Sequence, residues 1–442
     1  MARADVGVVG AGLAGLLTAI ELADAGATVR VLAAGHAATH WTPATVDLGF
    51  LTGVRTPAAA VAQLAGRAGH PYAHLGAVLP DALRSLRAIL AESGLALVGE
   101  PDDPVATIPT AIGSTRPAAI VPDAMAAALR PWAGDETLVV LGIAGFRDYW
   151  AEAIAASLRE PSAWRGHQLP GRIEAIDVDL PGLVGRHNLS GLHLARAFDD
   201  PAWRDDALDR LARALDGLAV GRGRVALPAV LGLHDHPAVL AAARDRLPLD
   251  PFEVALVPPS VPGLRQFHAL RDALRRRGGR IQIGAEVRGE LDGRRVTELS
   301  SPAAARRFRL SVGSVVLATG GIAGGGIVGR QDGGLTEQVL GLPIQAPPAD
   351  DWLAIDPFDP AGHPLEAAGV LTDAQLRPIE AGGDVLVDNV RIVGSLLAGQ
   401  RYLREWCGDG VAIASARLVG RDLGGSVPES VSLLVSVKGP AS

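Results

Sequence analysis

Apolar positions near the start of the chain predict a strand, a helix and a second strand in quick succession. Residues 6–9 form a short apolar run, as expected of a buried strand. In residues 16–25 the apolar side chains recur at helical spacing, Gly26 ends that pattern, and residues 27–33 form a second strand-like run. A strand, a helix and a strand within about 30 residues are typical of a parallel nucleotide-binding unit.

The turn between the first strand and the helix has the glycine spacing of a dinucleotide site. Gly10 permits a tight turn, Gly12 lets a pyrophosphate approach the backbone, and Gly15 lets the helix pack on the strand. The start of the predicted helix would offer free N–H groups and the positive end of the helix dipole to a phosphate, and Leu13 and Ala14 in the turn before it are predicted to bind the cofactor as well. A glycine-rich turn that binds no nucleotide is the alternative.

The acidic residue that usually binds the ribose is missing. In such units the second strand ends in Asp or Glu, which accepts a hydrogen bond from a ribose hydroxyl. Here the strand ends in Ala33, Ala34 and Gly35. Ribose binding must use other groups, or the cofactor is held differently. We predict a bound flavin, with FAD as the expected cofactor and FMN as the alternative.

A second nucleotide signal lies far downstream. Residues 308–317 alternate and then become apolar, and they lead into Ala318, Thr319 and Gly320. In flavoproteins with two-dinucleotide-binding domains, a strand with this ending returns the chain to the nucleotide domain. An ordinary strand before a glycine turn is the alternative.

The segment before that strand predicts an adenine contact. Residues 267–277 have a helical pattern that ends at Gly278, and residues 280–287 follow as a strand. In flavin domains of this type the backbone after such a helix often contacts the adenine. Val287 is therefore the predicted contact.

A third signal lies near the C-terminus. Residues 390–397 predict a strand, with Gly394 and Gly399 flanking the next turn, and residues 411–418 predict a helix. The residues that open this helix are Gly408, Asp409, Gly410 and Val411. With its start against the flavin pyrimidine, the helix dipole would stabilise negative charge on the reduced ring. Asp409 could equally cap the helix, and the two interpretations are compatible.

The region between these signals predicts an inserted domain. Residues 105–257 contain no nucleotide signature, and they hold a strand-like run at 137–141 and helix-like runs at 148–158 and 205–214. We therefore predict an α/β fold, namely a two-dinucleotide-binding, Rossmann-like flavin domain with an inserted α+β cap. The predicted boundaries are residues 1–104 plus 258–425 for the flavin domain, 105–257 for the cap, and 426–442 for a tail that is either a strand or disordered.

Composition and charge narrow the classes of function. The chain has 442 residues, 48% of them hydrophobic and 20% charged, so it can bury a sizeable core, and its net charge of −7 argues against a nucleic-acid-binding surface. The single cysteine, Cys407, excludes an intrachain disulfide and an iron–sulfur cluster held by four cysteines of this chain. The single lysine, Lys438, argues against Schiff-base chemistry.

Targeting signals are absent from the sequence. It contains no run of 18 or more apolar residues, and its start lacks the pattern of a secretory leader. We expect a cytoplasmic protein whose contact with a membrane would come through a partner.

Seven segments together resemble one family, the B subunits of anaerobic glycerol-3-phosphate dehydrogenases, which are flavoproteins related to those of fumarate reductases. TAIGSTRP, PPSVPGLR and the C-terminal stretch are more specific to it than the opening glycine motif. The chain departs from the family at residues 40–45, where the family has a Ser/Gly-rich loop, so the flavin environment differs there. The matching segments are residues 6–26, 40–48, 107–122, 145–158, 226–233, 256–270 and 394–416.

The resemblance implies one component of a respiratory enzyme with three subunits. One flavoprotein subunit oxidises glycerol 3-phosphate, the B subunit carries a second flavin, and an iron–sulfur subunit passes electrons to menaquinone at the membrane. The single cysteine of this chain is consistent with clusters held elsewhere. Membership of the family would also be compatible with a dehydrogenase complex for another substrate.

Several polar residues are candidates for the site, each with a structural alternative. His40 and Asp47 bracket the loop after the second strand, and His40 is a candidate for hydrogen bonding to the flavin or a surface histidine. Arg116 matches a flavin phosphate or an anionic substrate, or else forms a structural ion pair. The same two interpretations apply to Arg147, Arg265 and His268, and the structural one is favoured. His40, Arg116, Arg265 and His268 are thus weak catalytic candidates.

No metal site is predicted. His234 and His236 stand two residues apart in a proline-bounded loop, which makes a poor metal cage. Cys407 could be a covalent flavin link or a redox thiol, and a buried, inert thiol is the favoured interpretation.

Three functions follow from these features. The first is a flavin-binding electron-transfer subunit of a glycerol-3-phosphate dehydrogenase complex. The second is a self-contained flavin dehydrogenase or reductase that acts on a small anionic substrate under the inserted domain. The third is a scaffold subunit whose flavin site has degenerated, which the missing ribose acid would explain.

Overall fold

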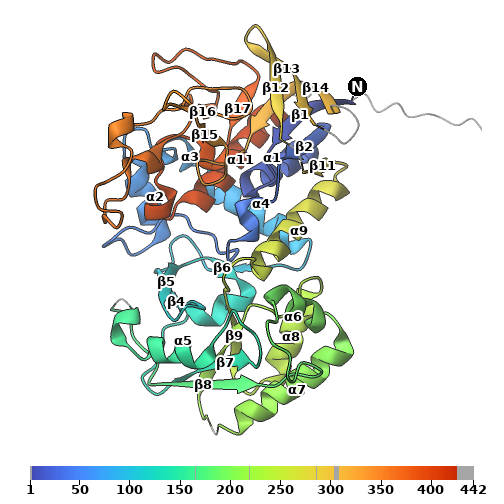
Figure 1. Cartoon of the computed structure of the whole chain (residues 1–442), viewed down its shortest axis with the longest axis vertical. Helices are drawn as coiled ribbons and strands as arrows, with labels where there is room; N and C mark the ends of the chain where they lie inside the picture. Colours follow the sequence, from blue (N-terminus) through green and yellow to red (C-terminus); the bar gives the residue numbers. More distant parts are fainter. Residues whose placement is uncertain (1, 165, 219, 285, 303–307, 426–442) are drawn as a thin grey trace, which may run out of the picture.

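Two hydrophobic cores divide the chain into two lobes (Figure 1). The computed structural model describes residues 2–164, 166–218, 220–284, 286–302 and 308–425, so the predicted tail at 426–442 lies outside the described residues. The first core combines residues 4–120 with residues 267–419, and the second is built from residues 108–261. The residues of the two cores therefore overlap in the sequence between residues 108 and 120. The predicted domain boundaries stay predictions.

A mixed sheet of seven strands forms the centre of the upper lobe. Its order is β11-β2-β1-β14-β13-β12, with β17 pairing to the end of β14. The first four strands of this order and β17 run parallel, whereas β13 pairs antiparallel with both β14 and β12. The strands are β1 (Ala2–Val9), β2 (Val29–Ala33), β11 (Arg280–Ile283), β12 (Arg288–Asp292), β13 (Arg295–Ser301), β14 (Phe308–Leu317) and β17 (Val390–Ile392).

Helices pack on this sheet with α1 at their centre. Helix α1 contacts α9 and α11, and α4 contacts both of these as well. The approach of α11 to α1 is close, because a Cβ at Gly420 would lie 2.5 Å from the Cβ of Glu21. The helices of this lobe are α1 (Leu13–Asp24), α2 (Pro57–Ala65), α3 (Tyr72–Leu75), α4 (Leu79–Ala91), α9 (Val261–Arg276), α10 (Tyr402–Glu405) and α11 (Gly408–Gly424). The predicted strand–helix–strand unit is confirmed as β1, α1 and β2.

The lower lobe has a parallel sheet of its own, in the order β10-β9-β7-β8. Fully buried runs such as that of β7 are typical of parallel strands covered on both faces. The sequence predicted an α+β cap and did not predict this regular parallel sheet. The elements are β7 (Thr137–Ile143), β8 (Arg172–Val178), β9 (Gly223–Pro228), β10 (Asp250–Val254), α5 (Ala151–Leu158), α6 (Gly191–Phe198), α7 (Pro201–Asp216) and α8 (His236–Arg246).

Short elements join the lobes and complete the surface. At the seam the N–H of Val46 donates to the carbonyl of Ile120 at 2.9 Å, and the N–H of Ser260 donates to the carbonyl of His40 at 2.9 Å. Three small antiparallel pairs are β3 (Leu97–Val98) with β6 (Val121–Pro122), β4 (Ala106–Pro109) with β5 (Thr115–Ala118), and β15 (Ile327–Gly329) with β16 (Leu335–Glu337). The 3-10 turns are η1 (Ala38–His40), η2 (Asp123–Leu129), η3 (Pro161–Trp164), η4 (Ala349–Asp351), η5 (Pro364–Ala367) and η6 (Gly394–Leu396).

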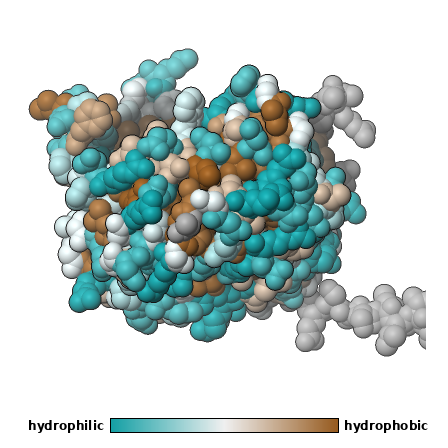
Figure 2. Space-filling view, turned by 90° about the horizontal axis from the view of Figure 1, so that it is seen from below, coloured by the Kyte–Doolittle hydropathy of each residue, from teal (hydrophilic) through white to brown (hydrophobic). Residues whose placement is uncertain are grey.

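Seen from below, the molecular surface is mostly hydrophilic, and apolar residues appear in small groups between the polar ones (Figure 2). Scattered apolar residues of this kind are normal on protein surfaces. Among the described residues, no helix has the length and apolar character needed to span a bilayer.

Three predicted elements need corrected bounds: two near the C-terminus, and the strand that was predicted to carry the adenine contact. The strand predicted at 390–397 ends at Ile392, because Gly394 takes a positive φ of 70° and starts the turn η6. The helix predicted at 411–418 is the longer α11, so Gly408 lies inside its first turn. The strand predicted at 280–287 ends at Ile283, where Gly284 takes a φ of 122°.

A buried arginine ties the second sheet to the segment before it. The guanidinium of Arg224 in β9 donates to the carboxylate of Glu136 at 2.8 Å and to the carbonyls of Ala127 and Arg130. It lies over the ring of Trp132, with 3.3 Å between the guanidinium carbon and the ring centroid. The Arg224 side chain is only 1% exposed, so the buried carboxylate of Glu136 would lack a cationic partner without it.

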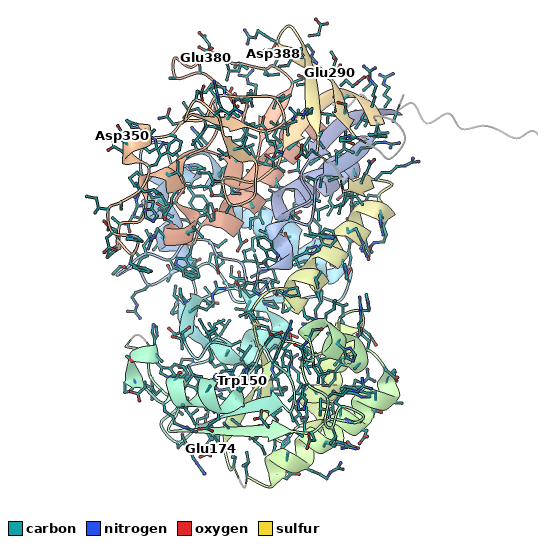
Figure 3. The ribbon with its side chains drawn as sticks, in the orientation of Figure 1. Trp150, Glu174, Glu290, Asp350, Glu380 and Asp388 are labelled. Atoms are coloured by element: carbon teal, nitrogen blue, oxygen red, sulfur yellow. The ribbon has the colours of Figure 1, made fainter. Side chains whose placement is uncertain are left out.

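Replacing Arg224 with Ala should lower the free energy of unfolding by about 3–5 kcal/mol, because Glu136 would remain buried without its cation. Denaturant unfolding of the full chain measures this. The matched control is Arg172→Ala, which removes an exposed partner of Glu174 at the outer edge of the lower lobe (Figure 3) and should cost at most about 1 kcal/mol. Equal losses in the two variants would contradict the structural role of Arg224.

Candidate functional site

In the turn before α1, the packing of the protein requires glycine at two of the three glycine positions and crowds the third much less. A Cβ at Gly10, whose φ is 116°, would lie 2.1 Å from the carbonyl oxygen of Ala318, and a Cβ at Gly15 would lie 2.1 Å from the carbonyl oxygen of Gly10. A Cβ at Gly12 would meet only the Cβ of Ala37, at 3.3 Å. Because the protein itself scarcely fills the space at Gly12, that space fits a group from outside the chain.

The start of α1 offers N–H groups toward this turn. Gly12 is the N-cap residue, and among the described residues no side chain caps it, so the first N–H groups, at Leu13 and Ala14, have no capping partner. Neither does an acidic side chain occupy the first turn. Such a helix start is suited to a phosphate group.

The end of β14 lies against the same turn. Its pairing with β1 aligns Val9 with Leu317, and the N–H of Ala318 donates to the carbonyl of Val9 at 2.8 Å. Thr319 follows, and its buried Oγ1 has no hydrogen-bond partner among the described residues. A buried hydroxyl without a partner is costly, so a polar group of a ligand would complete it. The unpartnered Thr319 and the free space at Gly12 both fit a bound dinucleotide.

The C-terminal glycines lie at close-packed positions beside this edge of the sheet. A Cβ at Gly394 would lie 3.0 Å from the Cβ of Ala14, so the turn η6 sits directly against the start of α1. Gly399 has a φ of 88°, and a Cβ there would lie 2.0 Å from the carbonyl of Gly69. A Cβ at Gly410 would lie 1.9 Å from the hydroxyl of Tyr72. The close contacts account for the glycines at 399 and 410 within the protein itself.

Asp409 does not cap α11, so that interpretation was wrong. The helix begins at Gly408 and its N-cap residue is Cys407, which places Asp409 inside the first turn. The Oδ2 of Asp409 accepts the N–H of Asp47 at 3.1 Å, and the N–H of Gly410 donates back to the carbonyl of Asp47 at 3.1 Å. The start of α11 is thereby bound to the segment at residues 44–50.

Arg116 reaches the same segment from the hairpin of β4 and β5. Its guanidinium donates to the Oδ2 of Asp47 at 2.5 Å, and the exposed fractions of the two side chains are 16% and 15%. The guanidinium carbon also lies 5.0 Å from the ring centroid of Trp406, an arrangement that permits a cation–π contact. Sequence patterns could not show this, because the three residues come from distant segments.

Histidine rings form a row across the seam between the lobes. The ring centroids of His36 and His40 are 4.5 Å apart, that of Phe267 is 4.4 Å from His40, and those of His234 and His268 are 5.7 Å apart in parallel planes. The Nε2 of His40 and the Nδ1 of His268 are buried and have no partner among the described residues. Burial lowers the pKa of His40, with help from His36, and burial followed by Arg271 and His234 lowers the pKa of His268 to about 4.

The remaining arginine candidates are paired inside the protein. Arg265 is buried, donates to both carboxylate oxygens of Glu253 at 2.6 and 2.9 Å, and donates through Nε to the carbonyl of Gly232. Arg147 is half-exposed, donates to Asn188 at 2.6 Å and lies 3.3 Å from Asp148. Arg265 thus forms a structural ion pair with Glu253 at the seam. Val287, the predicted adenine contact, is buried between β11 and β12.

One trio among the described residues brings three potential metal ligands together: His70, Glu405 and Cys407. Their ligand atoms lie within 4.8 Å of one another and all three residues are buried. The carboxylate of Glu405 already accepts hydrogen bonds from Arg67 at 2.8 Å and from the N–H of Arg401 at 2.7 Å, and His70 lies 3.4 Å away. Burial raises the pKa of the Cys407 thiol, which disfavours the thiolate that metals and flavin links need. The three side chains therefore form an internal hydrogen-bonded cluster.

Comparisons with known proteins agree with this geometry. A family model described as an FAD binding domain matches residues 5–411. The B subunit of anaerobic glycerol-3-phosphate dehydrogenase from Yersinia enterocolitica is 31% identical over 436 residues, which cover 95% of this chain and 97% of that protein. A probable B subunit of the same enzyme from Halobacterium salinarum is 31% identical over 433 residues, with 95% and 97% covered.

Solved structures align along nearly the whole chain at low identity. A 3-ketosteroid Δ1-dehydrogenase from Sterolibacterium denitrificans is 11% identical with a TM-score of 0.45, and the alignment covers 97% of this chain and 100% of that one. An E. coli quinol fumarate reductase chain is 11% identical with a TM-score of 0.40, covering 96% of this chain and 71% of that one. The family match and the full-length relatives establish that the chain belongs to the FAD-binding flavoproteins that include the B subunits of anaerobic glycerol-3-phosphate dehydrogenases.

Proposed function

We propose that this protein is the flavin-binding electron-transfer subunit of a glycerol-3-phosphate dehydrogenase complex. In this role it receives electrons from a catalytic flavoprotein subunit and passes them to an iron–sulfur subunit and on to quinone. The complex would lie at the cytoplasmic face of the membrane and be held there through the partner subunits. Relatives named as B subunits of that enzyme, aligned over 95% of the chain, support the assignment.

The pairing of the arginines supports this role most directly. Glycerol 3-phosphate carries a phosphate group, whose recognition calls for cations that are free to pair with it. Each of the three arginines that the sequence offered for an anionic substrate has an acidic partner instead, namely Asp47 for Arg116, Asp148 for Arg147 and Glu253 for Arg265. A chain that binds FAD but has its candidate cations neutralised is suited to electron transfer rather than to substrate oxidation.

The proposed FAD site combines four segments. The turn and helix start would bind the pyrophosphate, the segment after β11 the adenine, the end of β14 the neighbouring part of the cofactor, and the start of α11 with His40 the flavin ring. Bound there, FAD supplies an acceptor and donor of electrons. The proposed binding residues are Gly10, Gly12, Leu13, Ala14, Gly15, His40, Val287, Ala318, Thr319, Gly320, Gly399, Gly408, Asp409, Gly410 and Val411.

One observation favours the rival, a self-contained FAD-dependent dehydrogenase. The Nε2 of His40 and the Nδ1 of His268 are buried without a partner among the described residues, and His40 contributes to the lowered pKa of His268. Neutral imidazoles without partners are suited to accept a proton from a substrate. By contrast, the free space at Gly12 and the unpartnered Thr319 support cofactor binding over a degenerate scaffold.

Replacing Gly12 with Val should reduce the affinity for FAD at least tenfold while the apo protein stays folded. The new Cβ meets only the Cβ of Ala37 in the protein, at 3.3 Å, but the valine side chain occupies the space proposed for the pyrophosphate. FAD titration by fluorescence quenching and thermal melts of the apo protein measure the two effects. Gly329→Val is the matched control, because that exposed glycine of β15 has no atom within 4 Å of a new Cβ. Full FAD occupancy in the Gly12 variant would refute the proposed site.

The isolated, FAD-loaded chain should oxidise glycerol 3-phosphate with an artificial acceptor far more slowly than about 1 s⁻¹, the lower end of ordinary enzyme turnover. Its FAD should nevertheless be reduced by dithionite, and addition of the partner flavoprotein subunit should allow reduction by the substrate. Stopped-flow absorbance follows both reactions. Turnover at ordinary enzyme rates by the chain alone would favour the self-contained dehydrogenase.

A further inference from the structure

Two carboxylates share one guanidinium at the start of α11. The amide of Asp47 donates to the Oδ2 of Asp409, and Arg116 donates to the Oδ2 of Asp47 at 2.5 Å. The Asp47 side chain is 15% exposed, and Asp409 is likewise partly buried. With both carboxylates ionised and Arg116 protonated, the cluster would have one uncompensated negative charge inside the protein.

Within the part of the chain that the structure describes, the groups around Asp409 do not supply a second cation. The carboxylate of Glu405 is matched by Arg67, and the hydroxyl of Tyr72 donates to the carbonyl of Leu48 at 2.6 Å. The titratable and charged groups that interact with Asp409 from the surrounding elements are Asp47, Tyr72, Arg116 and Cys407. A buried charge without a partner is expensive, and taking up a proton removes it.

The position of Asp409 makes this uptake unusual. A carboxylate in the first turn of a helix is ordinarily stabilised in its ionised form by the helix dipole. Here burial first and the charge of Asp47 second raise the pKa of Asp409 to about 7. Burial raises the pKa of Asp47 as well, but the adjacent Arg116 opposes that rise. The two carboxyl groups are therefore unequal, and Asp409 is the one suited to hold the proton.

We propose that Asp47 and Asp409 form a buried proton-binding site in which Arg116 keeps Asp47 ionised, the proton resides on Asp409, and its occupancy follows the charge on the FAD. The last part rests on the proposed function, because it needs the flavin ring at the start of α11. Electrons entering the cofactor, from the partner subunit or from a chemical reductant, add negative charge next to Asp409. Its carboxylate then takes one proton from solvent, forming an O–H bond at Oδ1, and releases it when the electrons leave. Arg116 acts as a positioning residue that determines which carboxyl group is protonated.

Infrared spectroscopy of the purified holo chain, from about pH 5 to about pH 9, tests the proton site directly. The wild type should show the band of a protonated carboxylic acid that disappears with a midpoint near neutral pH. Asp409→Asn should abolish this titrating band. Asp47→Asn should move its midpoint down by at least about one pH unit, because Asp409 would then pair with Arg116 alone. Glu92→Gln, which alters an ion pair with Arg276 and Arg277 on the surface, is the control and should leave the band unchanged.

Potentiometric titration of the bound FAD over the same pH range tests the coupling. Above the midpoint of the infrared titration, where Asp409 is deprotonated before reduction, the reduction potential of the wild type should fall more steeply with pH than that of Asp409→Asn, by the equivalent of up to one proton. A missing band in the wild type, or a band that survives in Asp409→Asn, would overturn the proton site. Equal slopes in the two proteins would overturn the coupling. Rapid oxidation of glycerol 3-phosphate by the chain alone would refute the proposed function and leave the proton site standing.

Discussion

The parallel pairing of β1 with β14 is the constraint on which the rest of the structure depends. It aligns Ala2 with Leu310 and Val9 with Leu317, so the first strand and a strand some 300 residues later end at the same edge. Gly10 can follow β1 only because it has no side chain, since a Cβ would lie 2.1 Å from the carbonyl oxygen of Ala318. The glycine turn and the unpartnered Thr319 therefore lie at the same edge of the sheet. The C-terminal ends of parallel strands are where open α/β sheets bind ligands.

Local patterns could predict the elements that follow this constraint. The run at residues 6–9, the glycines at 10, 12 and 15 and the run at 315–317 each combine a period with a punctuating residue, and β1, α1 and β14 lie where these patterns indicate. Boundaries set by backbone conformation were less predictable. Gly394 ends β17 by a positive φ, and nothing in its neighbours distinguishes that glycine from one inside a strand.

Ion pairs between distant segments could not be predicted, because no period or spacing encodes them. Asp409 was expected to cap its own helix, yet it binds the amide of Asp47, 362 residues away. Arg116 and Arg265 were considered for an anionic ligand, and both have carboxylates as partners within 2.6 Å. These pairings support the proposed function, since they give acidic partners to the cations that a substrate phosphate would need, and they bring two carboxyl groups together at the start of α11. The chemistry of the site thus depends on tertiary contacts more than on its glycine motif.

The central claim is that segments far apart in the sequence form one FAD site, and hydrogen–deuterium exchange of the full chain with and without FAD at three of these segments tests it most directly. Bound FAD should slow amide exchange at residues 10–15, 318–321 and 408–411 together, because their N–H groups would be shielded or hydrogen-bonded by the cofactor. Strand β8, at the outer edge of the lower lobe, should exchange at the same rate in both states. Protection that spares residues 10–15, or that is confined to the lower lobe, would contradict the account.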